Sequence, residues 1–559
     1  MISKKNQELQ DKLGQAWKAS QERQTKMQAA RGHFGYIDLH KIAVSTDALE
    51  LISEETARNL HIVPFALKSN QLYLGVLDPQ KDSLRALLKD LQKQGYLVKI
   101  FLISKDSLEY AWGFYKFVSK TKGQVSSKVD IAKSRISELT EELNSYEAVQ
   151  RAIKKSAASS ASDAVEVVVA GALALRASDI HFESDKSDAK IRYRIDGVLE
   201  DLIDGLSHHS YKLIINRIKL LSSLQLNAAK SQDGRFTFTI GETVIELRVS
   251  LIPSEFGETM VIRVLDPRII QLQLSELGMR EDDLAIVDRE LKSPNGMILN
   301  TGPTGSGKTT TLYAFLHKVA NPEIKIITIE DPIEYHLNDI EQTQVDKKRG
   351  YTFANGLQAI MRQDPDIILV GEIRDEDTAA VAIQAALTGH VVFSTLHTNS
   401  ASGVIPRLIN LGAPVSSIGA ALNLVIAQRL MRRLCEKCKK RVEMTEEIKK
   451  NFEKFLSTLP ERVRRASVNT IDLYQVNPGG CQSCTPSGYK GRVGIFELLE
   501  VGEEIEFLIE KKTSEAEINR FAQEQGMVTL QQDALLKASQ GLTSFEEVEK
   551  VTGAIQWGK

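Results

Sequence analysis

One eight-residue stretch sets the fold of this chain, and it reads Gly302-Pro303-Thr304-Gly305-Ser306-Gly307-Lys308-Thr309. It matches the pattern G-x-x-x-x-G-K-[ST] in full. The strand-like run 296–300 precedes it and the helical run 310–319 follows it. Such a loop, placed between a strand and a helix, holds phosphate groups on its backbone N–H groups. The alternative is a chance glycine-rich turn, which the correct placement of both flanks disfavours.

The side chains of this loop predict a nucleotide with its metal ion. Lys308 supplies a positive charge for the β and γ phosphates, and the Thr309 hydroxyl is a ligand for Mg²⁺. We also assign the next residue, Thr310, to the nucleotide site. The predicted cofactors are therefore ATP and Mg²⁺.

Two later strands end in carboxylates, as a magnesium site at the edge of a parallel sheet requires. The apolar run 367–370 ends in Gly371-Glu372, and we expect Glu372 to hold the metal through water. The run 324–329 ends in Glu330, which we expect to activate the attacking water, with Glu334 also in the nucleotide site. The alternative for 330–334 is an acidic surface turn.

A third strand, expected at 391–396, is followed by His397. A histidine at the end of a strand in the same sheet is placed to sense the γ phosphate. The alternative is a histidine with a purely structural role in the core.

Composition limits the class of protein. The chain has 559 residues, 42% of them hydrophobic, which is enough for several domains. Its 71 Lys and Arg residues against 73 Asp and Glu residues give a net charge of -2, so the basic surface of a nucleic-acid binder is missing. The amino terminus is polar at once, and the most apolar run, 167–175, is too short to span a bilayer. We therefore expect a cytoplasmic protein for which nucleic acid is not the main substrate.

Patterns along the chain predict an α/β protein with several parts. Asp163 is expected to cap a helix that runs to about Arg176, after the small-residue run 156–162, which we interpret as part of a hinge. The expected parts are a polar amino-terminal segment (1–33), a small α/β domain (34–118), a linker and helix (119–150), a middle α/β domain (151–268), a mainly parallel nucleotide-binding core (269–430), a tetracysteine subdomain (431–500) and carboxyl-terminal helices (501–559).

All four cysteines lie in two Cys-x-x-Cys pairs, namely Cys435 with Cys438 and Cys481 with Cys484. Four thiolates can enclose one tetrahedral zinc ion, and four protein ligands would make that ion structural. The alternatives are reduced buried cysteines or a redox pair.

The order and spacing of several motifs resemble the secretion ATPases, a family of type II secretion and type IV pilus-assembly motors. The motifs are the phosphate loop, the run 329–334, the run 364–375 and the run 388–397, supported by 177–181, 232–235 and 526–530. The resemblance implies a RecA-like core, a PAS-like middle domain and a structural zinc in the carboxyl-terminal part. Retraction motors of this family lack both an amino-terminal module and the cysteine pairs, and this chain has both. It therefore resembles the pilus-extension or the type II secretion branch, with the former slightly preferred.

The resemblance also implies partners and further site residues. It implies a homohexamer at the inner face of the cytoplasmic membrane, held there by an inner-membrane platform protein and a membrane-side docking protein, with pilin as an indirect partner. Arg248 and Arg263 resemble the arginines of the family that reach the γ phosphate, and Arg235 is a third candidate. For any one of them, the alternative is a strand arginine that faces solvent or pairs with an acid.

Two other functions stay open at this point. One is a nucleic-acid translocase with the same core fold, which DNA would stimulate in a strongly salt-dependent way. The other is a scaffold that binds ATP without turnover. The presence of both Glu330 and Glu372 argues against the scaffold.

Overall fold

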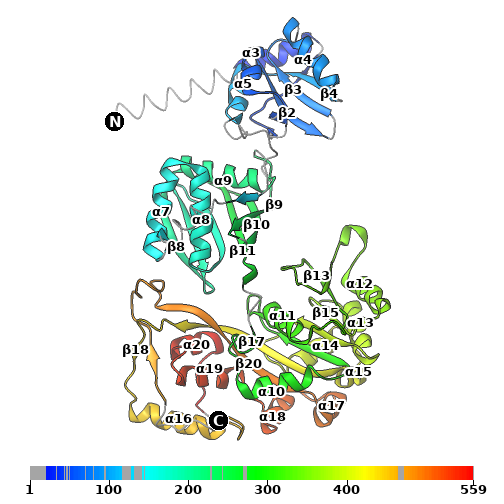
Figure 1. Ribbon diagram of the computed structural model, residues 1–559, viewed down its shortest axis with the longest axis vertical. Coiled ribbons are helices and arrows are strands. Elements are labelled where there is room, and N and C mark those ends of the chain that lie inside the picture. Colours follow the sequence, from blue (N-terminus) through cyan, green and yellow to red (C-terminus); the bar gives the residue numbers. More distant parts are fainter. Residues whose placement is uncertain are drawn as a thin grey trace. The chain divides into compact units, whose positions relative to one another are not determined.

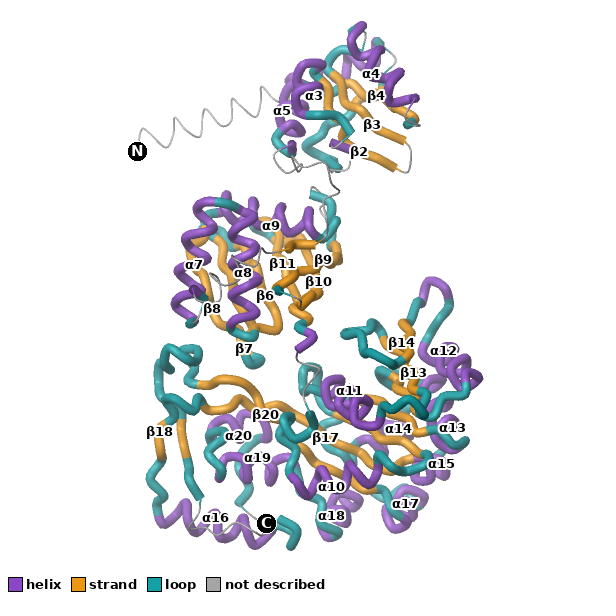
Figure 2. The backbone as a smooth tube through the Cα atoms, viewed as in Figure 1, coloured by secondary structure: helices purple, strands orange, loops and turns teal. Residues whose placement is uncertain are grey.

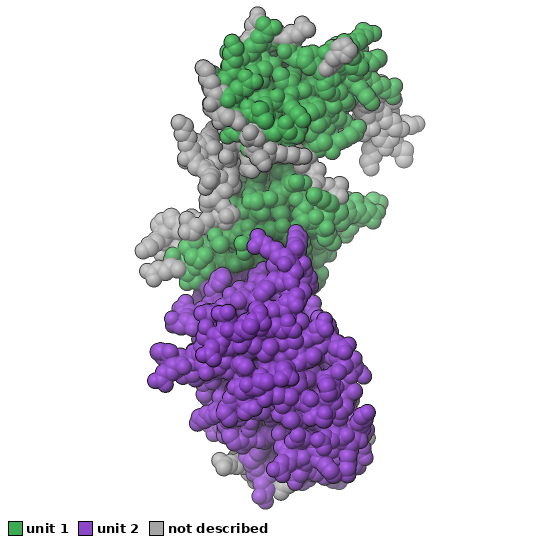
Figure 3. All heavy atoms as spheres, turned by 90° about the vertical axis from the view of Figure 1, so that its right-hand side faces the viewer, with its two compact units in different colours: residues 1–144, 148–264 green, residues 145–147, 265–559 purple. Residues whose placement is uncertain are grey.

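The computed structural model divides the chain into two compact units (Figure 3). Unit 1 comprises residues 1–144 and 148–264, and unit 2 comprises residues 145–147 and 265–559. The predicted polar segment 1–33 is described only at 20–32, helical to residue 31, and the predicted linker 119–150 lies largely outside the described residues. The described residues are 20–32, 34–42, 44–45, 48–49, 51–68, 71–79, 81–93, 96–115, 128–130, 142–143, 145–226, 230–241, 243–268, 273–463 and 471–557.

Unit 1 begins with a four-stranded sheet of order β1-β4-β3-β2. Strand β4 pairs in parallel with β1 and β3, and β2 pairs antiparallel with β3. The sheet and its helices correspond to the small α/β domain expected at 34–118. Its elements are β1 (Gly35–Tyr36), α3 (Glu54–Leu60), β2 (Ile62–Lys68), β3 (Gln71–Val76), α4 (Asp82–Lys93), β4 (Leu97–Leu102) and α5 (Lys105–Trp112).

A second, seven-stranded sheet of order β5-β9-β10-β11-β6-β7-β8 follows in the same unit. Six of its strands, β6 to β11, lie within the middle α/β domain expected at 151–268, and β5 comes from the part of the chain before it. Helix α8 packs on β6 and α9. The elements are β5 (Lys128–Asp130), α7 (Tyr146–Ser159), α8 (Ala161–Ala174), β6 (Ala177–Ser184), β7 (Ala189–Ile195), β8 (Val198–Leu206), α9 (His208–Leu221), β9 (Gln232–Ile240), β10 (Thr243–Ser254) and β11 (Gly257–Leu265).

The start of α8 differs from the sequence prediction. Ser160, not Asp163, is the N-cap: it has extended backbone, and its hydroxyl accepts the N–H of Asp163 at 3.3 Å. Asp163 lies in the first turn, where its charge favours the helix dipole. The run 156–162, predicted as part of a hinge, is helical on both sides of Ser160, because alanine is the best helix former. In the described part of the chain, no helix is long and apolar enough to cross a bilayer.

Unit 2 contains a second seven-stranded sheet, of order β14-β13-β15-β16-β12-β17-β20 (Figure 2). All neighbouring pairs are parallel except β17 with β20. The predicted mainly parallel core is therefore confirmed. Its elements are α10 (Glu281–Glu290), β12 (Gly296–Thr301), α11 (Lys308–Val319), β13 (Ile326–Glu330), β14 (Glu341–Gln344), α12 (Phe353–Ile360), β15 (Ile367–Val370), α13 (Glu376–Leu387), β16 (Val391–Leu396), α14 (Val404–Asn410), α15 (Val415–Ala421), β17 (Leu422–Leu434) and β20 (Tyr489–Glu500).

Helices cover both faces of this sheet, as a parallel sheet requires (Figure 1). Strand β12 shows how the faces are divided. Ile298 belongs to the core cluster with α10 and α11, whereas Met297 and Leu299 belong to the cluster that contains α12, α13 and α15. Successive side chains of a strand point to opposite faces, so a continuous apolar run is needed where both faces are buried.

The sheet crosses the boundary that the sequence suggested at residue 430. Strand β17 continues to Leu434, and β20 returns antiparallel to it from the far side of the tetracysteine segment. The pairing of β17 with β20 could not be seen locally, because the two strands are far apart in the sequence. The remaining elements are β18 (Lys440–Arg441), α16 (Glu446–Thr458), β19 (Tyr474–Gln475), α17 (Glu503–Glu510), α18 (Glu515–Glu524), α19 (Leu530–Ser539) and α20 (Phe545–Thr552).

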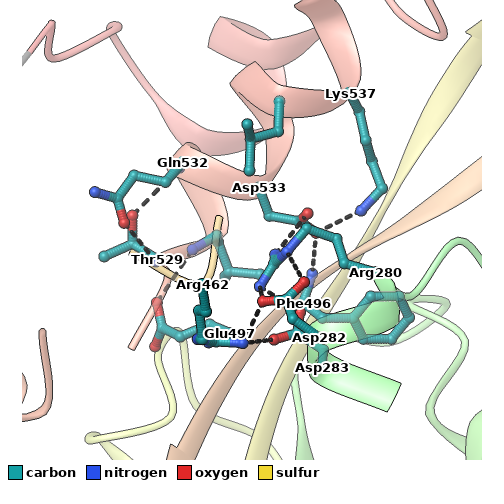
Figure 4. Close-up of polar contacts among 12 residues, drawn as sticks. Arg280, Asp282, Asp283, Arg462, Phe496, Glu497, Thr529, Gln532, Asp533 and Lys537 are labelled. Carbon is teal, nitrogen blue, oxygen red and sulfur yellow. Dashed lines mark hydrogen bonds and ion pairs between the residues drawn. The ribbon is translucent and has the colours of Figure 1, made fainter. Parts of the chain in front are cut away.

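A buried charge network joins α19 to the first helix of the unit (Figure 4). Asp533 is fully buried and accepts hydrogen bonds from Arg280 Nη1 at 2.8 Å, from Lys537 Nζ at 2.5 Å and from the N–H of Phe496 at 2.8 Å. Arg280 also contacts Asp283, at 2.6 Å, and burial raises the pKa of Asp283 to about 6. The carboxyl-terminal helices are thus tied to the nucleotide-binding sheet by charged as well as apolar contacts.

Candidate active site

The phosphate loop joins β12 to α11, and its backbone requires glycine at two close approaches. Gly302 has φ 152° and Gly307 has φ 90°, both outside the usual range of other residues. A Cβ atom at Gly302 would lie 2.3 Å from the carbonyl oxygen of Gln428, and one at Gly307 would lie 2.9 Å from Gln428 Nε2. The side chain of Ser306 is buried, and its Oγ has no hydrogen-bond partner among the described residues. The loop therefore forms a narrow cradle with a free polar atom, which fits a bound phosphate chain.

Lys308 is the first residue of α11 and lies inside this loop. Its Nζ donates to the carbonyl oxygens of Gly302 at 2.8 Å and Pro303 at 3.1 Å. Burial lowers the pKa of Lys308, while the nearby Glu372 acts in the opposite direction. Pro303, Thr304 and Gly305 are exposed at the tip of the loop, and Thr309 and Thr310 are half-buried in the first turn of α11, where a ligand can reach them.

Glu372 and His397 lie beside Lys308, on neighbouring strands of the sheet. Glu372 follows β15, and its Oε2 lies 2.5 Å from Arg374 Nε in an ion pair and 3.7 Å from His397 Nε2. Burial and the charge of Lys308 lower the pKa of His397, so the imidazole is neutral at pH 7. His397 is 49% exposed, which contradicts the alternative of a buried core histidine. The structure thus brings together a cation, a carboxylate and a neutral imidazole at one sheet edge.

Glu330 has a different environment. Its carboxylate is buried and accepts hydrogen bonds from Tyr313 OH, from Thr328 Oγ1 at 2.6 Å and from Gln342 Nε2 at 3.1 Å. Burial, followed by the charge of Glu330, raises the pKa of Tyr313. The alternative of an acidic surface turn is wrong for Glu330 itself, although Asp331 is exposed.

The backbone of Glu330 nevertheless runs beside the strand that carries Glu372. The N–H of Gly371 donates to the carbonyl oxygen of Ile329 at 2.8 Å, and a Cβ atom at Gly371 would lie 3.4 Å from the Cα of Glu330. Glu334, farther along the same loop, is half-buried and adds to the negative charge around Tyr313. The two predicted carboxylates therefore leave adjacent strand ends with different hydrogen-bond partners.

The three candidate arginines lie in unit 1, on adjacent strands of the middle sheet. Arg235 on β9 is directly opposite Arg248 on β10 in the strand register. Arg263 on β11 is opposite Asp179 on β6, with Arg263 Nε 3.1 Å from Asp179 Oδ1. Arg235 and Arg263 are 78% and 59% exposed, whereas Arg248 is 28% exposed and its Nε donates to Glu246 Oε1 at 3.2 Å. The structure therefore shows the alternative, a strand arginine paired with an acid, for Arg248 and Arg263.

The four cysteines form one cluster in unit 2. Their Sγ atoms lie within 4.8 Å of one another, with separations of 3.8 Å for Cys435 and Cys481, 3.8 Å for Cys438 and Cys484, and 3.7 Å for Cys481 and Cys484. A tetrahedron of sulfur atoms about 2.3 Å from a zinc ion has edges of about 3.8 Å. All four cysteines are free, so the spacing fits a metal ion.

Sequence reasoning missed the polar residues behind the phosphate loop. Gln428 is buried in β17, and its Oε1 accepts from Asn300 Nδ2 at 2.8 Å and from Thr311 Oγ1 at 2.9 Å. Thr301, the last residue before the loop, shares a 2.8 Å hydrogen bond between its hydroxyl and that of Thr398. A single amide inside the apolar run 424–428 was the available signal for Gln428. Neither Thr301 nor Thr398 carries a comparable signal.

Comparison with known proteins gives consistent matches. A family model described as "Type II/IV secretion system protein" matches residues 154–550, and an MshEN domain model matches residues 33–114. The type IV pilus assembly ATPase PilB of Pseudomonas aeruginosa is 36% identical over 536 residues, which cover 94% of this chain and 90% of that protein. The type II secretion system protein E of Dickeya dadantii is 42% identical over 389 residues, which cover 69% and 75% respectively.

Among solved structures, the Legionella pneumophila ATPase DotB matches with a TM-score of 0.51 and 22% identity, over 70% of this chain and 95% of that chain. This likeness concerns the fold alone.

Replacement of Glu330 with Gln tests the predicted base. We expect ATP affinity to persist while kcat falls at least ~10²-fold, because the general base is lost and the phosphate cradle is intact. The Tyr313 and Thr328 hydroxyls can rotate to accept from the new amide, so the fold should tolerate the change. Nucleotide binding by fluorescence titration and single-turnover hydrolysis are the measurements, with Tyr313→Phe as the control that removes one donor only. Wild-type turnover in Glu330→Gln would assign Glu330 to anchoring α11 on β13.

Proposed function

The chain belongs to the type II/IV secretion system protein family, and we propose that it is the ATPase that drives assembly of type IV pilus or type II secretion pseudopilus subunits. The observation that carries this proposal is the joint placement of Lys308, Glu372 and His397 at the mouth of the glycine cradle. Bound ATP with Mg²⁺ supplies the phosphoanhydride bond whose hydrolysis provides the energy.

The residues of the chain then have distinct tasks. The loop 302–309 and Lys308 bind the phosphates, and Thr310 and Glu334 complete the nucleotide site. Thr309 and Glu372 would hold Mg²⁺, Glu372 through water. The neutral imidazole of His397 would respond to the γ phosphate. Glu330 would orient and deprotonate the attacking water, which requires one of its present donors, such as Gln342, to give way.

Assembly of a pilus is favoured over secretion by the extent of the relationship. The PilB relative aligns with 94% of this chain, whereas the type II secretion relative aligns with 69% of it. The PilB match therefore extends over the part that precedes the ATPase core as well. We propose on this basis that the chain serves pilus extension.

The motor itself would lie in the cytoplasm and work with several partners at the membrane. We expect a homohexamer held at the inner face of the cytoplasmic membrane by an inner-membrane platform protein and a membrane-side docking protein. Rotation or displacement of the platform would add pilin subunits, which the ATPase itself need not touch. A net charge of -2 provides no overall electrostatic attraction to nucleic acid, which disfavours it as the main substrate.

The function is tested by Lys308→Ala in the organism that makes the protein. We expect the variant to be present at normal levels but to leave the cells without surface pili, because ATP binding is lost. The purified wild-type chain should hydrolyse ATP at a rate that DNA does not change. Normal pili in the variant, or stimulation by DNA that weakens steeply with salt, would contradict the proposal.

We further propose that Arg248 and Arg263, with Arg235 beside them, clamp the γ phosphate when the middle domain closes on an ATPase core. Phosphoryl transfer needs cations around the developing charge, and the loop supplies only Lys308. The proposal is supported by the position of Arg235 opposite Arg248 across β9 and β10 and by the 59% exposure of Arg263 on the neighbouring strand β11. Glu246 Oε1 lies 3.2 Å from Arg248 Nε and 4.0 Å from Arg235 Nη1, so the γ phosphate would take over from this carboxylate as the anionic partner of the two arginines.

Arg248→Ala and Arg263→Ala should affect ATP and ADP differently, because only ATP carries a γ phosphate. ADP affinity should be nearly unchanged, while ATP turnover falls on the order of 10³-fold, the scale of a lost arginine finger. The matched control is Arg192→Ala on β7 of the same sheet, an arginine that pairs with carboxylates as Arg248 and Arg263 do but is not a candidate for the γ phosphate. An equal loss of ADP and ATP binding, or full turnover, would show that these arginines do not sense the γ phosphate.

We also propose that the four cysteines bind a structural zinc ion. The spacing of their sulfur atoms supports this, and the Ser483 N–H donates to Cys481 Sγ at 3.4 Å. Four protein ligands leave no open position for a substrate. The ion would tie the end of β17 to the loop that leads into β20.

Purified protein should therefore contain about one zinc per chain by elemental analysis. Cys481→Ser should remove the metal and lower the unfolding temperature of unit 2, because an incomplete ligand set cannot hold the ion. Ser483→Ala, in the same loop but without a ligand atom, is the matched control. Metal-free protein of normal stability with four titratable thiols would refute the zinc site.

A further inference from the structure

The loop that joins β16 to α14, residues 397–403, contacts the nucleotide site at its beginning. His397 faces Glu372, as described above. The next residue, Thr398, donates its N–H to Thr301 Oγ1 at 2.8 Å, and Thr301 directly precedes the phosphate loop. The position of this loop therefore determines where His397 and Thr398 lie relative to the nucleotide.

The same loop is held from its other side by the carboxyl-terminal part of the chain. Ala401 donates its N–H to Glu497 Oε1 at 2.8 Å, and Ser400 Oγ donates to Glu515 Oε1 at 2.7 Å. Asn519 Nδ2 donates to Ser402 Oγ at 3.3 Å. Three successive residues of the loop are thus bonded to β20 and α18, and none of these bonds contributes to the phosphate cradle itself.

Glu497 is the buried member of this set. It is 4% exposed on β20, and its second oxygen, Oε2, accepts the N–H of Leu530 at 3.2 Å at the start of α19 (Figure 4). Burial raises the pKa of Glu497, whereas the N–H groups of Ala401 and Leu530 and the charge of Arg429 act in the opposite direction. One carboxylate therefore bridges the loop and the amino terminus of α19, with one oxygen for each.

A carboxylate at this position is costly for the fold alone. The neighbours of Glu497 on β20 are buried apolar residues, and a buried acid is retained at a cost unless donors compensate it. An anchor for α19 already exists in Asp533, which accepts the N–H of Phe496, the residue before Glu497. The contact that Glu497 adds and Asp533 lacks is the one with the β16–α14 loop.

We propose that Glu497 is a positioning residue for ATP hydrolysis, which holds the β16–α14 loop so that His397 and Thr398 are aligned with Glu372 and the phosphate loop. The proposal rests on the proposed function, ATP hydrolysis at this site. It also makes the carboxyl-terminal helices part of the catalytic unit, because a shift of α19 relative to β20 moves the oxygen that Ala401 depends on.

Steady-state kinetics of the purified full chain with Glu497→Gln tests this role. The amide keeps one acceptor but turns its NH₂ toward one of the two N–H donors, so one bridge is lost with little change in volume. We expect kcat to fall at least ~10-fold, with KM for ATP and ADP affinity within about twofold of the wild type, because alignment and not binding is affected. Loss of affinity in parallel with kcat would overturn the proposal.

The matched control is Glu547→Gln on α20, a buried carboxylate whose oxygens accept from the N–H and guanidinium groups of Arg432 on β17 and not from the β16–α14 loop or α19. It should lower the unfolding temperature but leave kcat within about twofold. An equal fall of kcat in both variants would show that Glu497 acts only through general stability. In a His397→Ala background, Glu497→Gln should cost clearly less than in the wild type, because the two act through one loop, and fully additive losses would contradict this.

If Glu497→Gln does not fold, Glu515→Ala takes its place. It removes the exposed anchor of Ser400 and should lower kcat about twofold to threefold at constant KM. Unchanged kcat in that variant would overturn the proposal. A wild-type chain that does not hydrolyse ATP at all would instead refute the proposed function, so the two failures are distinguishable.

Discussion

The structure of unit 2 depends on one constraint, that the strands β12, β13, β15 and β16 are parallel and therefore end at the same edge of the sheet. Each strand end delivers one group to this edge: the phosphate loop after β12, Glu330 at β13, Glu372 after β15 and His397 after β16. Parallel strands need crossover helices, which cover both faces and demand apolar strands. Burial and active-site geometry thus have the same origin.

The carboxyl-terminal third completes this core. Strand β20 covers the edge of β17. Two hydrogen bonds join α19 to β20: Asp533 of α19 accepts the N–H of Phe496, and Glu497 of β20 accepts the N–H of Leu530. Removing several charges from water costs several kcal/mol per ion, so the Arg280–Asp533–Lys537 network is poor evidence for added stability. We expect it mainly to specify where α19 lies, which matters if Glu497 must reach both α19 and Ala401.

The fold and the nucleotide loop could be predicted because their signals are local. The glycine pattern is confined to residues 302–309, and Glu372 directly follows the apolar run of β15 and Gly371. The environment of Glu330 could not be predicted, because Tyr313 and Gln342 come from two different elements that only the folded sheet brings together. The pairing of β17 with β20 could not be predicted for the same reason.

The prediction that Asp163 caps α8 was wrong for a local reason. Ser160 and Asp163 are both good capping residues, and only the extended backbone at Ser160 decides between them. Competition between nearby capping residues limits the prediction of helix ends. In the site, prediction is limited because the contacting residues are far apart along the chain. The cysteine cluster is intermediate: the motif identified the four cysteines, and only the structure shows that their sulfur atoms lie together. The difference between local and long-range contacts matters for a motor. Phosphate binding depends on a short stretch of sequence, whereas the link from the site to β20 and α19 depends on contacts between distant residues, such as Ala401 with Glu497. Coupling therefore has to be sought in the long-range hydrogen bonds of the β16–α14 loop, where a small displacement is passed between packed elements.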